Sequence, residues 1–323
     1  MKITENALEI LTAMTYKGIG KAWVVKNIDG NGPLEQVVEL LNRAAKEQYS
    51  ISVNDFDNRK ENIRKKCEAL DGSIDGVVGI GDPDFPPYRG VVKNSERPVA
   101  LFYRGNLDLL KRQNTIAAVI GLLNPDEDTE TSESAIVSEL VRNGVTILSG
   151  LALGCDSIAH KQTLISGGRT IAALPSSISD ILPAANKALA EHIVQKEGLL
   201  ISEYMEVAKS KMELTSRYIE RDRLQALFSD CVVLAASYSE NNVGNDSGAR
   251  HAMKYAASYS IMRAVMYHGE AHSTNPKYDL NRQLIKEGDV VVIKGSDLQE
   301  VLKRIQSVHA TPSNNEWKQT DLF

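Results

Sequence analysis

This chain of 323 residues has few cysteines and no excess of positive charge, and each of these absences excludes a class of protein. The three cysteines, Cys67, Cys155 and Cys231, are odd in number and widely separated, which excludes a disulfide framework. Their pattern is typical of reduced, buried thiols. The 37 Lys and Arg residues are outnumbered by 42 Asp and Glu residues, which gives a net charge of −5. Nonspecific wrapping by nucleic acid is therefore not expected, and any such contact requires a local basic patch.

Long apolar runs are also missing. No segment approaches about 18 consecutive apolar residues, and Glu5 and Glu9 interrupt the first apolar stretch, so neither a membrane span nor a secretory signal is expected. The histidines are not spaced with Asp, Glu or Cys in a ligand pattern, and we predict neither a metal nor a cofactor. An apolar content of 42% predicts one large core with a smaller attached domain in a cytoplasmic protein.

The first part of the chain, residues 1–72, has helical periodicity and predicts a small helical domain. Apolar residues recur at helical spacing over 7–14, 33–48 and 58–70, and Gly18-Ile-Gly20 and Gly30-Asn-Gly32 lie between the first two segments. The sequence Lys17-Gly-Ile-Gly-Lys21 resembles the hairpin of helix-hairpin-helix modules, in which glycine amides approach a DNA phosphate. A plain turn between two helices explains the same residues.

Residues 73–308 alternate short β-branched runs with helical segments, which predicts an α/β fold with a mostly parallel sheet covered on both faces. We expect strands at 100–103, 116–120, 145–148, 170–174, 199–201, 231–235, 261–266 and 290–293. Ligands of such sheets bind beyond the carboxyl ends of the strands. The residues expected at that edge are Gly121, Ser149, Pro175, Ser202 and Ser237.

The stretch from Ser149 to His160 is the most informative one, because an apolar strand runs into a small-residue loop and then a helix. Gly150 and Gly154 allow backbone amides to approach a ligand, and a helix beginning near Asp156 directs its positive end at the same point, as in phosphate sites. Plain packing explains the pattern equally well. No partners make Cys155 a nucleophile. His160 lies one helical turn after Asp156, which predicts a hydrogen bond between them; acid or base catalysis is the alternative.

Several motifs in one order resemble the DNA-processing protein A (DprA/Smf) family. They are Ser149-Gly-x-Ala-x-Gly-x-Asp-x-x-Ala-His160, Gly167-Gly-Arg-Thr-Ile-Ala172, Pro183-x-x-Asn186 and Leu200-Ile-Ser-Glu-Tyr204. Matches continue upstream at 81–87 and 97–106 and downstream at 221–226, 247–249 and 280–285, so that about 230 residues are covered. The resemblance implies a Rossmann-like fold, a homodimer, and binding of single-stranded DNA in recombination or natural transformation. It also implies loading of a RecA-type recombinase, without turnover.

A basic cluster is the expected DNA contact, because the arginine fork donates two parallel hydrogen bonds to phosphate. Alternatively, Arg221 and Arg223 pair with Glu220 and Asp222 on a solvated helix. The candidate DNA-binding or phosphate-binding residues are Gly121, Ser149, Gly150, Gly154, Asp156, His160, Arg217, Arg221, Arg223, Ser247, Gly248, Arg250 and Lys254.

The chain departs from the family pattern at the first main strand. The family has Gly-Ser-Arg there, whereas this chain reads Gly121-Leu-Leu-Asn124 followed by the acidic segment 125–130. Carboxylates there either cap a helix or repel a phosphate. The family's Arg-Asn-Arg becomes Arg221-Asp-Arg223, and its C-terminal winged helix is not expected. These differences predict a divergent member whose DNA pocket is altered at one wall.

A second function stays open, namely a nucleotide sensor or nucleotide hydrolase, for example in phage defence. The acidic residues from Asp126 to Glu133 would then meet a ribose or a base. Against a hydrolase, the Pro-Gly-Gly-x-Gly-Thr signature of related phosphoribohydrolases is missing. Glu203 is expected to orient a loop, and no enzyme is predicted.

Residues 309–323 are polar and predict a mobile tail. The last five residues resemble the peptide by which bacterial proteins dock on the replicative sliding clamp. In that peptide the glutamine, here Gln319, occupies a polar subsite, and the Leu-Phe pair, here Leu322 and Phe323, fills an apolar pocket. Asp321 completes the predicted clamp-binding residues. Alternatively, Leu322 and Phe323 fold back onto the body.

Overall fold

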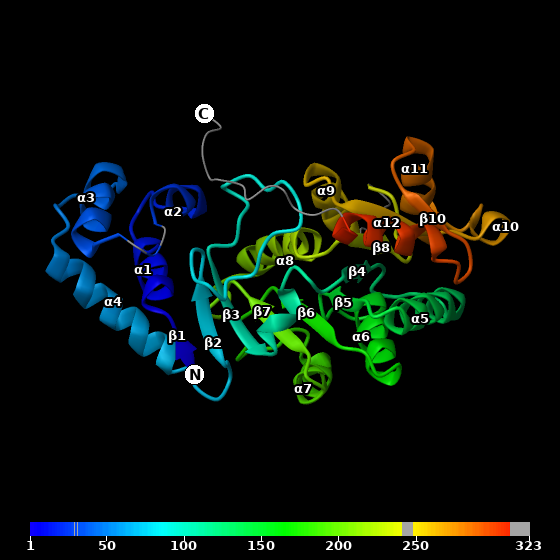
Figure 1. The fold of residues 1–323 in the computed structure, drawn as a ribbon, viewed down its shortest axis with the longest axis horizontal. Coiled ribbons are helices and arrows are strands. Elements are labelled where there is room, and N and C mark those ends of the chain that lie inside the picture. Colours follow the sequence, from blue (N-terminus) through cyan, green and yellow to red (C-terminus); the bar gives the residue numbers. More distant parts are fainter. Residues whose placement is uncertain (29, 31, 241–247, 311–323) are drawn as a thin grey trace.

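The centre of the molecule is one ten-stranded sheet (Figure 1). A computed structural model describes residues 1–28, 30, 32–240 and 248–310. The strand order is β1-β2-β3-β7-β6-β5-β4-β8-β9-β10, and β3 is antiparallel to both of its neighbours, whereas the other recorded pairs are parallel. The strands are β1 Lys2–Ile3, β2 Gly76–Gly79, β3 Ala100–Gly105, β4 Ile116–Ile120, β5 Thr146–Ser149, β6 Thr170–Leu174, β7 Leu199–Ser202, β8 Cys231–Leu234, β9 Met262–Met266 and β10 Val291–Ile293.

Helices cover both faces of the sheet because the strand residues alternate between two buried faces. Ile116, Ala118 and Ile120 of β4 pack in one apolar cluster with α8, α9 and α11, whereas Ala117 and Val119 pack on the opposite face with α5, α6 and α12. The bounds are α5 Glu127–Arg142, α6 Cys155–Ile165, α7 Lys187–Gln195, α8 Lys211–Leu227, α9 Ala249–Ser258, α10 Gly269–His272, α11 Asp279–Glu287 and α12 Gln299–Ala310. The α/β fold predicted from the sequence is confirmed. Within the described ranges, no helix has the length and apolarity needed to cross a membrane.

An N-terminal helical unit gathers at the β1 end of the sheet, opposite β10, α10 and α11 (Figure 1). It consists of α1 Glu5–Ala13, α2 Lys21–Asn27, α3 Leu34–Ala44 and α4 Val53–Glu68. Tyr16, Leu41 and Phe56 share an apolar cluster with Ala100 of β3. Leu8 of α1 shares a second cluster with Phe102 of the same strand. The unit therefore packs directly on the sheet, and the predicted domain boundary after residue 72 stays a prediction.

All eight strands expected from the sequence are present within about two residues of their predicted bounds. The short strands β1 and β2 and the helix α2 were not predicted. Outside the described residues lie Ser247 and the predicted clamp-binding residues Gln319, Asp321, Leu322 and Phe323.

Candidate functional site

The loops that follow β4, β5, β6, β7 and β8 share one edge of the sheet, because these five strands are adjacent and parallel. Gly121 and Gly150 directly follow the last residues of β4 and β5, and Pro175 follows β6. Ser202 ends β7, and Ser237 lies three residues beyond the end of β8. The sequence motifs therefore converge at the carboxyl edge, where ligands of such sheets bind.

Side chains hold the glycine loop, residues 150–154, in a fixed conformation. Ser149 donates from Oγ to the Val119 carbonyl at 2.7 Å, and Asp156 accepts from the Ala152 amide at 3.1 Å. The Asn186 Nδ2 group donates to the Leu151 carbonyl at 2.8 Å and to two other oxygens of this region. Gly154 begins α6 with a φ of +70°, a conformation that disfavours other residues. The predicted helix start near Asp156 is confirmed.

The space above Gly150 is taken by the chain's own arginine. The Arg221 Nη1 atom lies 3.3 Å from Asp156 Oδ2, and its Nε lies 3.4 Å from Asp222 Oδ1. A Cβ added to Gly150 would lie 1.0 Å from Arg221 Nη1. Because Gly150 has no side chain, the guanidinium group of Arg221 can occupy this space.

Replacing Gly150 by alanine is expected to displace Arg221 from Asp156 and to lower the free energy of unfolding by about 1–3 kcal/mol. Urea unfolding measures the change. Gly269 is the matched control, because nothing lies within 4 Å of a Cβ built there. Equal stability of Gly150→Ala and Gly269→Ala would show that the guanidinium is not held in place.

The neighbouring arginines of α8 are buried and paired too. Arg223 makes two hydrogen bonds of 2.7 Å to Glu203, and Arg217 bonds Glu213 at 2.6 Å. Of the pairs considered from the sequence, Arg221 with Asp222 is present, but the carboxylate partner of Arg223 is Glu203, at the end of β7. With side chains no more than 10% exposed, Arg217, Arg221 and Arg223 do not form an open cationic surface.

The other basic candidates are on α9, which packs against α8, but the Lys254 side chain is exposed whereas the α8 arginines are buried. Arg250 and Lys254, both on α9, approach Glu240 at 3.9 and 3.2 Å. Gly248 precedes α9, and a Cβ there would lie 3.3 Å from Asp222 Oδ2. The structure therefore does not bring the predicted basic residues together into one surface patch.

His160 corrects one expectation. Its hydrogen-bond partner is Thr170 Oγ1, at 2.7 Å from Nδ1, and not Asp156. Because the Thr170 hydroxyl donates to the Ile147 carbonyl, His160 Nδ1 carries the proton that Thr170 accepts. The Nε2 atom has no hydrogen-bond partner within the described part of the chain. Burial lowers the pKa of His160 to about 4, so the ring is neutral.

Cys155 is also unsuited to chemistry. Its side chain is fully buried at the start of α6, and a Cβ on Gly121 would lie 2.6 Å from its sulfur atom. Burial, together with the nearby Glu133, raises the pKa of the Cys155 thiol well above its usual value, which disfavours the nucleophilic thiolate. The close contact with Gly121 instead fixes the start of α6 against the loop after β4.

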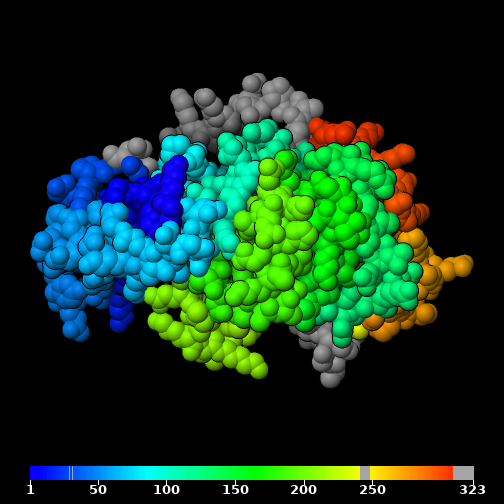
Figure 2. Space-filling view, turned by 90° about the horizontal axis from the view of Figure 1, so that it is seen from below, coloured from blue at the N-terminus to red at the C-terminus, as the bar shows by residue number. Residues whose placement is uncertain are grey.

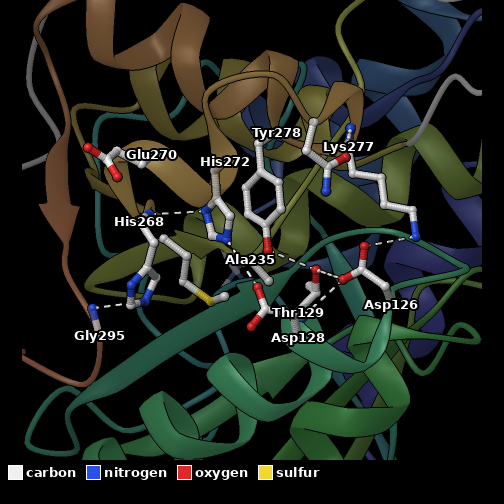
Figure 3. Close-up of polar contacts among 12 residues, drawn as sticks. Asp126, Asp128, Thr129, Ala235, His268, Glu270, His272, Lys277, Tyr278 and Gly295 are labelled. Carbon is white, nitrogen blue, oxygen red and sulfur yellow. Dashed lines mark hydrogen bonds and ion pairs between the residues drawn. The ribbon is translucent and has the colours of Figure 1, made fainter.

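The acidic segment after β4 serves the protein's own structure (Figure 3). Asp126 caps α5 by accepting from the Thr129 amide at 3.0 Å, and it lies 3.1 Å from Lys277. Burial acts to raise the pKa of Asp126, but the bonds from Thr129 and Lys277 outweigh it and lower the pKa to about 2. Asp128 lies 3.4 Å from His272, whose ring stacks on Tyr278 with centroids 3.5 Å apart. Helix capping, one of the two expectations, therefore accounts for Asp126, whereas Asp128 contacts His272.

A groove beside this edge was not predicted from the sequence. It has a volume of about 320 Å³, and its lining includes Ser176 after β6 and residues 207–211, which lead into α8. In Figure 2 the yellow-green segment around these residues projects next to the blue N-terminal helices. Ser210 caps α8 by accepting from the Glu213 amide at 3.1 Å. The available sequence signal was a serine between two lysines, Lys209 and Lys211, ahead of a helix.

No group of three or more His, Cys, Asp or Glu side chains is placed to hold a metal ion in the part of the chain that the structure describes. The groove offers hydroxyl, ammonium and apolar groups, together with one carboxylate, that of Asp180. Its full lining is Ser176, Asp180, Leu182, Val207, Ala208, Lys209, Ser210, Lys211 and Leu214.

The sequence of this chain is similar to those of known proteins. Residues 76–305 match the family model described as DNA recombination-mediator protein A. The chain is 34% identical to Protein Smf of Synechocystis over 181 residues, which cover 55% of this chain and 42% of that protein. It is 35% identical to DNA processing protein DprA of Streptococcus pneumoniae over 140 residues, 43% of this chain and 47% of that protein. The matched segments thus span about half or less of these relatives.

Solved structures agree on the fold. The structure of DprA from Streptococcus pneumoniae superposes with a TM-score of 0.70 at 24% identity and covers 94% of this chain and 98% of that one. A Helicobacter pylori DprA, solved to explain its mode of binding single-stranded DNA, gives a TM-score of 0.52 at 24% identity and covers 70% of this chain and 97% of that one. Because the family model matches well over half of the residues, this chain belongs to the DNA recombination-mediator protein A family.

Proposed function

We propose that this protein binds single-stranded DNA at the carboxyl edge of the sheet, in the groove lined by residues 207–211 and Ser176. Family membership is the observation that carries the proposal. The Helicobacter pylori relative, whose structure was described for its binding of single-stranded DNA, supports the choice of ligand. Binding, without turnover, is the proposed activity.

Two features of the groove, its positive charge and its apolar surface, support this choice of ligand. Lys209 and Lys211 are exposed and flank the start of α8, so ammonium groups and the positive end of a helix meet at one place. Val207, Leu182 and Leu214 add apolar surface on which an unpaired base can lie. The buried arginines Arg221 and Arg223 support this edge from inside, a revision of the DNA-contact role predicted for them.

Two partners belong to the same proposal. The family description as a recombination mediator supports the loading of a RecA-type recombinase. The sequence from Gln319 to Phe323 supports docking on the sliding clamp. A homodimer is part of the proposal by family resemblance.

Fluorescence anisotropy with a labelled oligo(dT) over a salt series tests the proposal. Wild type is expected to bind, with log affinity falling linearly against log salt concentration. The double variant Lys209→Met/Lys211→Met removes two phosphate contacts, so the slope should become shallower by about 1.4, since each single-strand contact contributes about 0.7.

The matched control is Lys286→Met/Lys303→Met, which removes the same charge from exposed positions on α11 and α12. An equal loss in both double variants would contradict the proposed groove. No binding by wild type at low salt would contradict DNA binding itself. Displacement of the oligonucleotide by micromolar free nucleotide would instead favour the nucleotide-sensor function.

A further inference from the structure

Lys21, the second lysine of the hairpin-like sequence, points into the protein. It is the first residue of α2, and its Nζ lies 3.1 Å from Glu203 Oε1 and 3.2 Å from Glu220 Oε2. Glu203 begins the segment between β7 and α8, residues 203–210, and Glu220 lies on α8 itself. One ammonium group of the N-terminal helical unit therefore bridges the start of this segment and the helix that follows it.

The segment 203–210 is attached to α8 at both of its halves, the second through the Lys209 amide, which donates to Glu213 at 2.9 Å, and through the Ser210 cap. Tyr204 donates from its hydroxyl to Glu220 at 3.3 Å, and the Arg217 guanidinium lies over the Tyr204 ring at 4.2 Å. The second half of the segment, residues 207–210, lines the groove. Because the two halves are continuous in the chain, we expect displacement of the first half to shift the groove residues Val207 and Ala208.

The N-terminal helical unit makes further contacts with the same first half. Lys66 of α4 bonds Glu206 at 2.7 Å, and the sulfur atoms of Cys67 and Met205 lie 3.7 Å apart. The contacted residues, Met205 and Glu206, follow Glu203 by two and three positions in the chain. The unit thus holds three positions of the segment, and Lys21 is the contact that reaches its start.

Lys21 also balances the local charge. Arg223 and Lys21 together face Glu203 and Glu220, so the four groups carry no net charge. Burial acts to raise the pKa of Glu203, but Arg223 and then Lys21 outweigh it and lower the pKa. Without the ammonium group, Glu203 keeps Arg223 as its ion-pair partner, and the Glu220 carboxylate is left beside it without the bridging cation. We expect the repulsion between the two carboxylates to weaken the attachment of the segment to α8.

We propose that Lys21 is a positioning residue for the DNA-binding groove, through which the hairpin of the N-terminal unit controls DNA affinity from inside the protein and without touching DNA. This inference rests on the proposed function. The sequence of the Gly18–Lys21 turn resembles a hairpin that contacts DNA phosphate. Under this inference, the turn instead holds the segment 203–210 in place.

The test compares Lys21→Met with Lys60→Met, which removes the same charge from the same unit. The Lys60 side chain is 16% exposed against 19% for Lys21, and its carboxylate partners, Glu5, Glu9 and Asp57, all lie within the unit. Lys21→Met is expected to weaken oligo(dT) binding by about three- to thirtyfold, the range usual for coupling mutations. Lys60→Met should stay within about twofold of wild type, and Lys21→Arg should restore the affinity.

The salt slope separates positioning from contact. If Lys21 only positions the groove, the slope of log affinity against log salt concentration is the same for Lys21→Met and wild type. If Lys21 contacts a phosphate, the slope for Lys21→Met is shallower by about 0.7. A shallower slope, or equal affinities of Lys21→Met and Lys60→Met, overturns the inference.

Hydrogen exchange tests the inference without DNA. Amides of residues 203–210 should exchange several times faster in Lys21→Met than in Lys60→Met, with amides of β4 and β5 unchanged. Unchanged exchange of the segment overturns the positioning role, even if the protein binds no DNA. Failure of wild type to bind DNA, with faster exchange in Lys21→Met, overturns the proposed function alone.

Discussion

Replacing Arg223 by methionine is expected to lower the free energy of unfolding by about 3–5 kcal/mol, the usual cost of removing one partner from a buried ion pair. Arg223 and Glu203 are 3% and 6% exposed, and two hydrogen bonds of 2.7 Å join them. Without Arg223, a carboxylate stays buried with only Lys21 beside it. Urea unfolding at neutral pH measures the loss.

Two controls distinguish the effect of leaving a buried charge unpaired from the effect of removing a positive charge. Arg43→Met breaks an ion pair with Glu39 whose side chains are 69% and 63% exposed, and such pairs contribute under about 1 kcal/mol. The double variant Arg223→Met/Glu203→Met should recover part of the lost stability, because the buried charge is then removed along with its partner. If Arg223→Met lowers the free energy of unfolding as little as Arg43→Met does, the buried ion pair between Arg223 and Glu203 is contradicted.

Acid is expected to destabilise the protein through His160. The pKa of this ring is about 4 in the folded protein against 6.5 for the ordinary side chain, so the unfolded chain binds a proton first as the pH falls. The contribution of His160 to stability is therefore complete above pH 6.5 and declines toward pH 4. Between pH 7.5 and 4.5 the loss amounts to about 2–3 kcal/mol, since one unit of pKa difference corresponds to about 1.4 kcal/mol.

His160→Gln isolates this term, because the glutamine amide can still donate toward Thr170 but does not titrate. The variant should lose less stability than wild type on acidification, by the same 2–3 kcal/mol estimated above from the pKa difference. His192→Gln, at an exposed position on α7, should follow wild type. Parallel pH profiles of wild type and His160→Gln would show that another group governs the acid loss.

Strands with a long apolar run could be predicted from the sequence. Short strands that are defined only by their pairing with a neighbouring strand could not. Ile116–Ile120 and Thr170–Leu174 are fully buried runs that the sequence located to the residue. The strand Gly76–Gly79 has only two apolar side chains between glycines, and Lys2–Ile3 has two residues in all. Their pairing with β3 and with each other defines them as strands, and no periodicity within so few residues can reveal it.

The site was predictable as a place but not as a set of contacts. Glycine spacing and strand ends located the carboxyl edge, since parallel strands bring their ends together by necessity. Charge spacing along α8 suggested Glu220 and Asp222 as partners, yet Arg223 reaches Glu203, 20 residues away in the chain. Likewise His160 bonds Thr170 on the adjacent strand and not Asp156 on its own helix. Such partners depend on tertiary packing, which local spacing does not encode.

The ends of the sheet limit how copies of this protein can associate. The outermost strands, β1 and β10, have only two and three residues, so each sheet end offers few unpaired amides and carbonyls to another chain. Short outer strands are a common defence against ribbon-like aggregation. Self-association by strand addition is thereby disfavoured, and the homodimer proposed for this protein is expected to form through side chains on helices and loops.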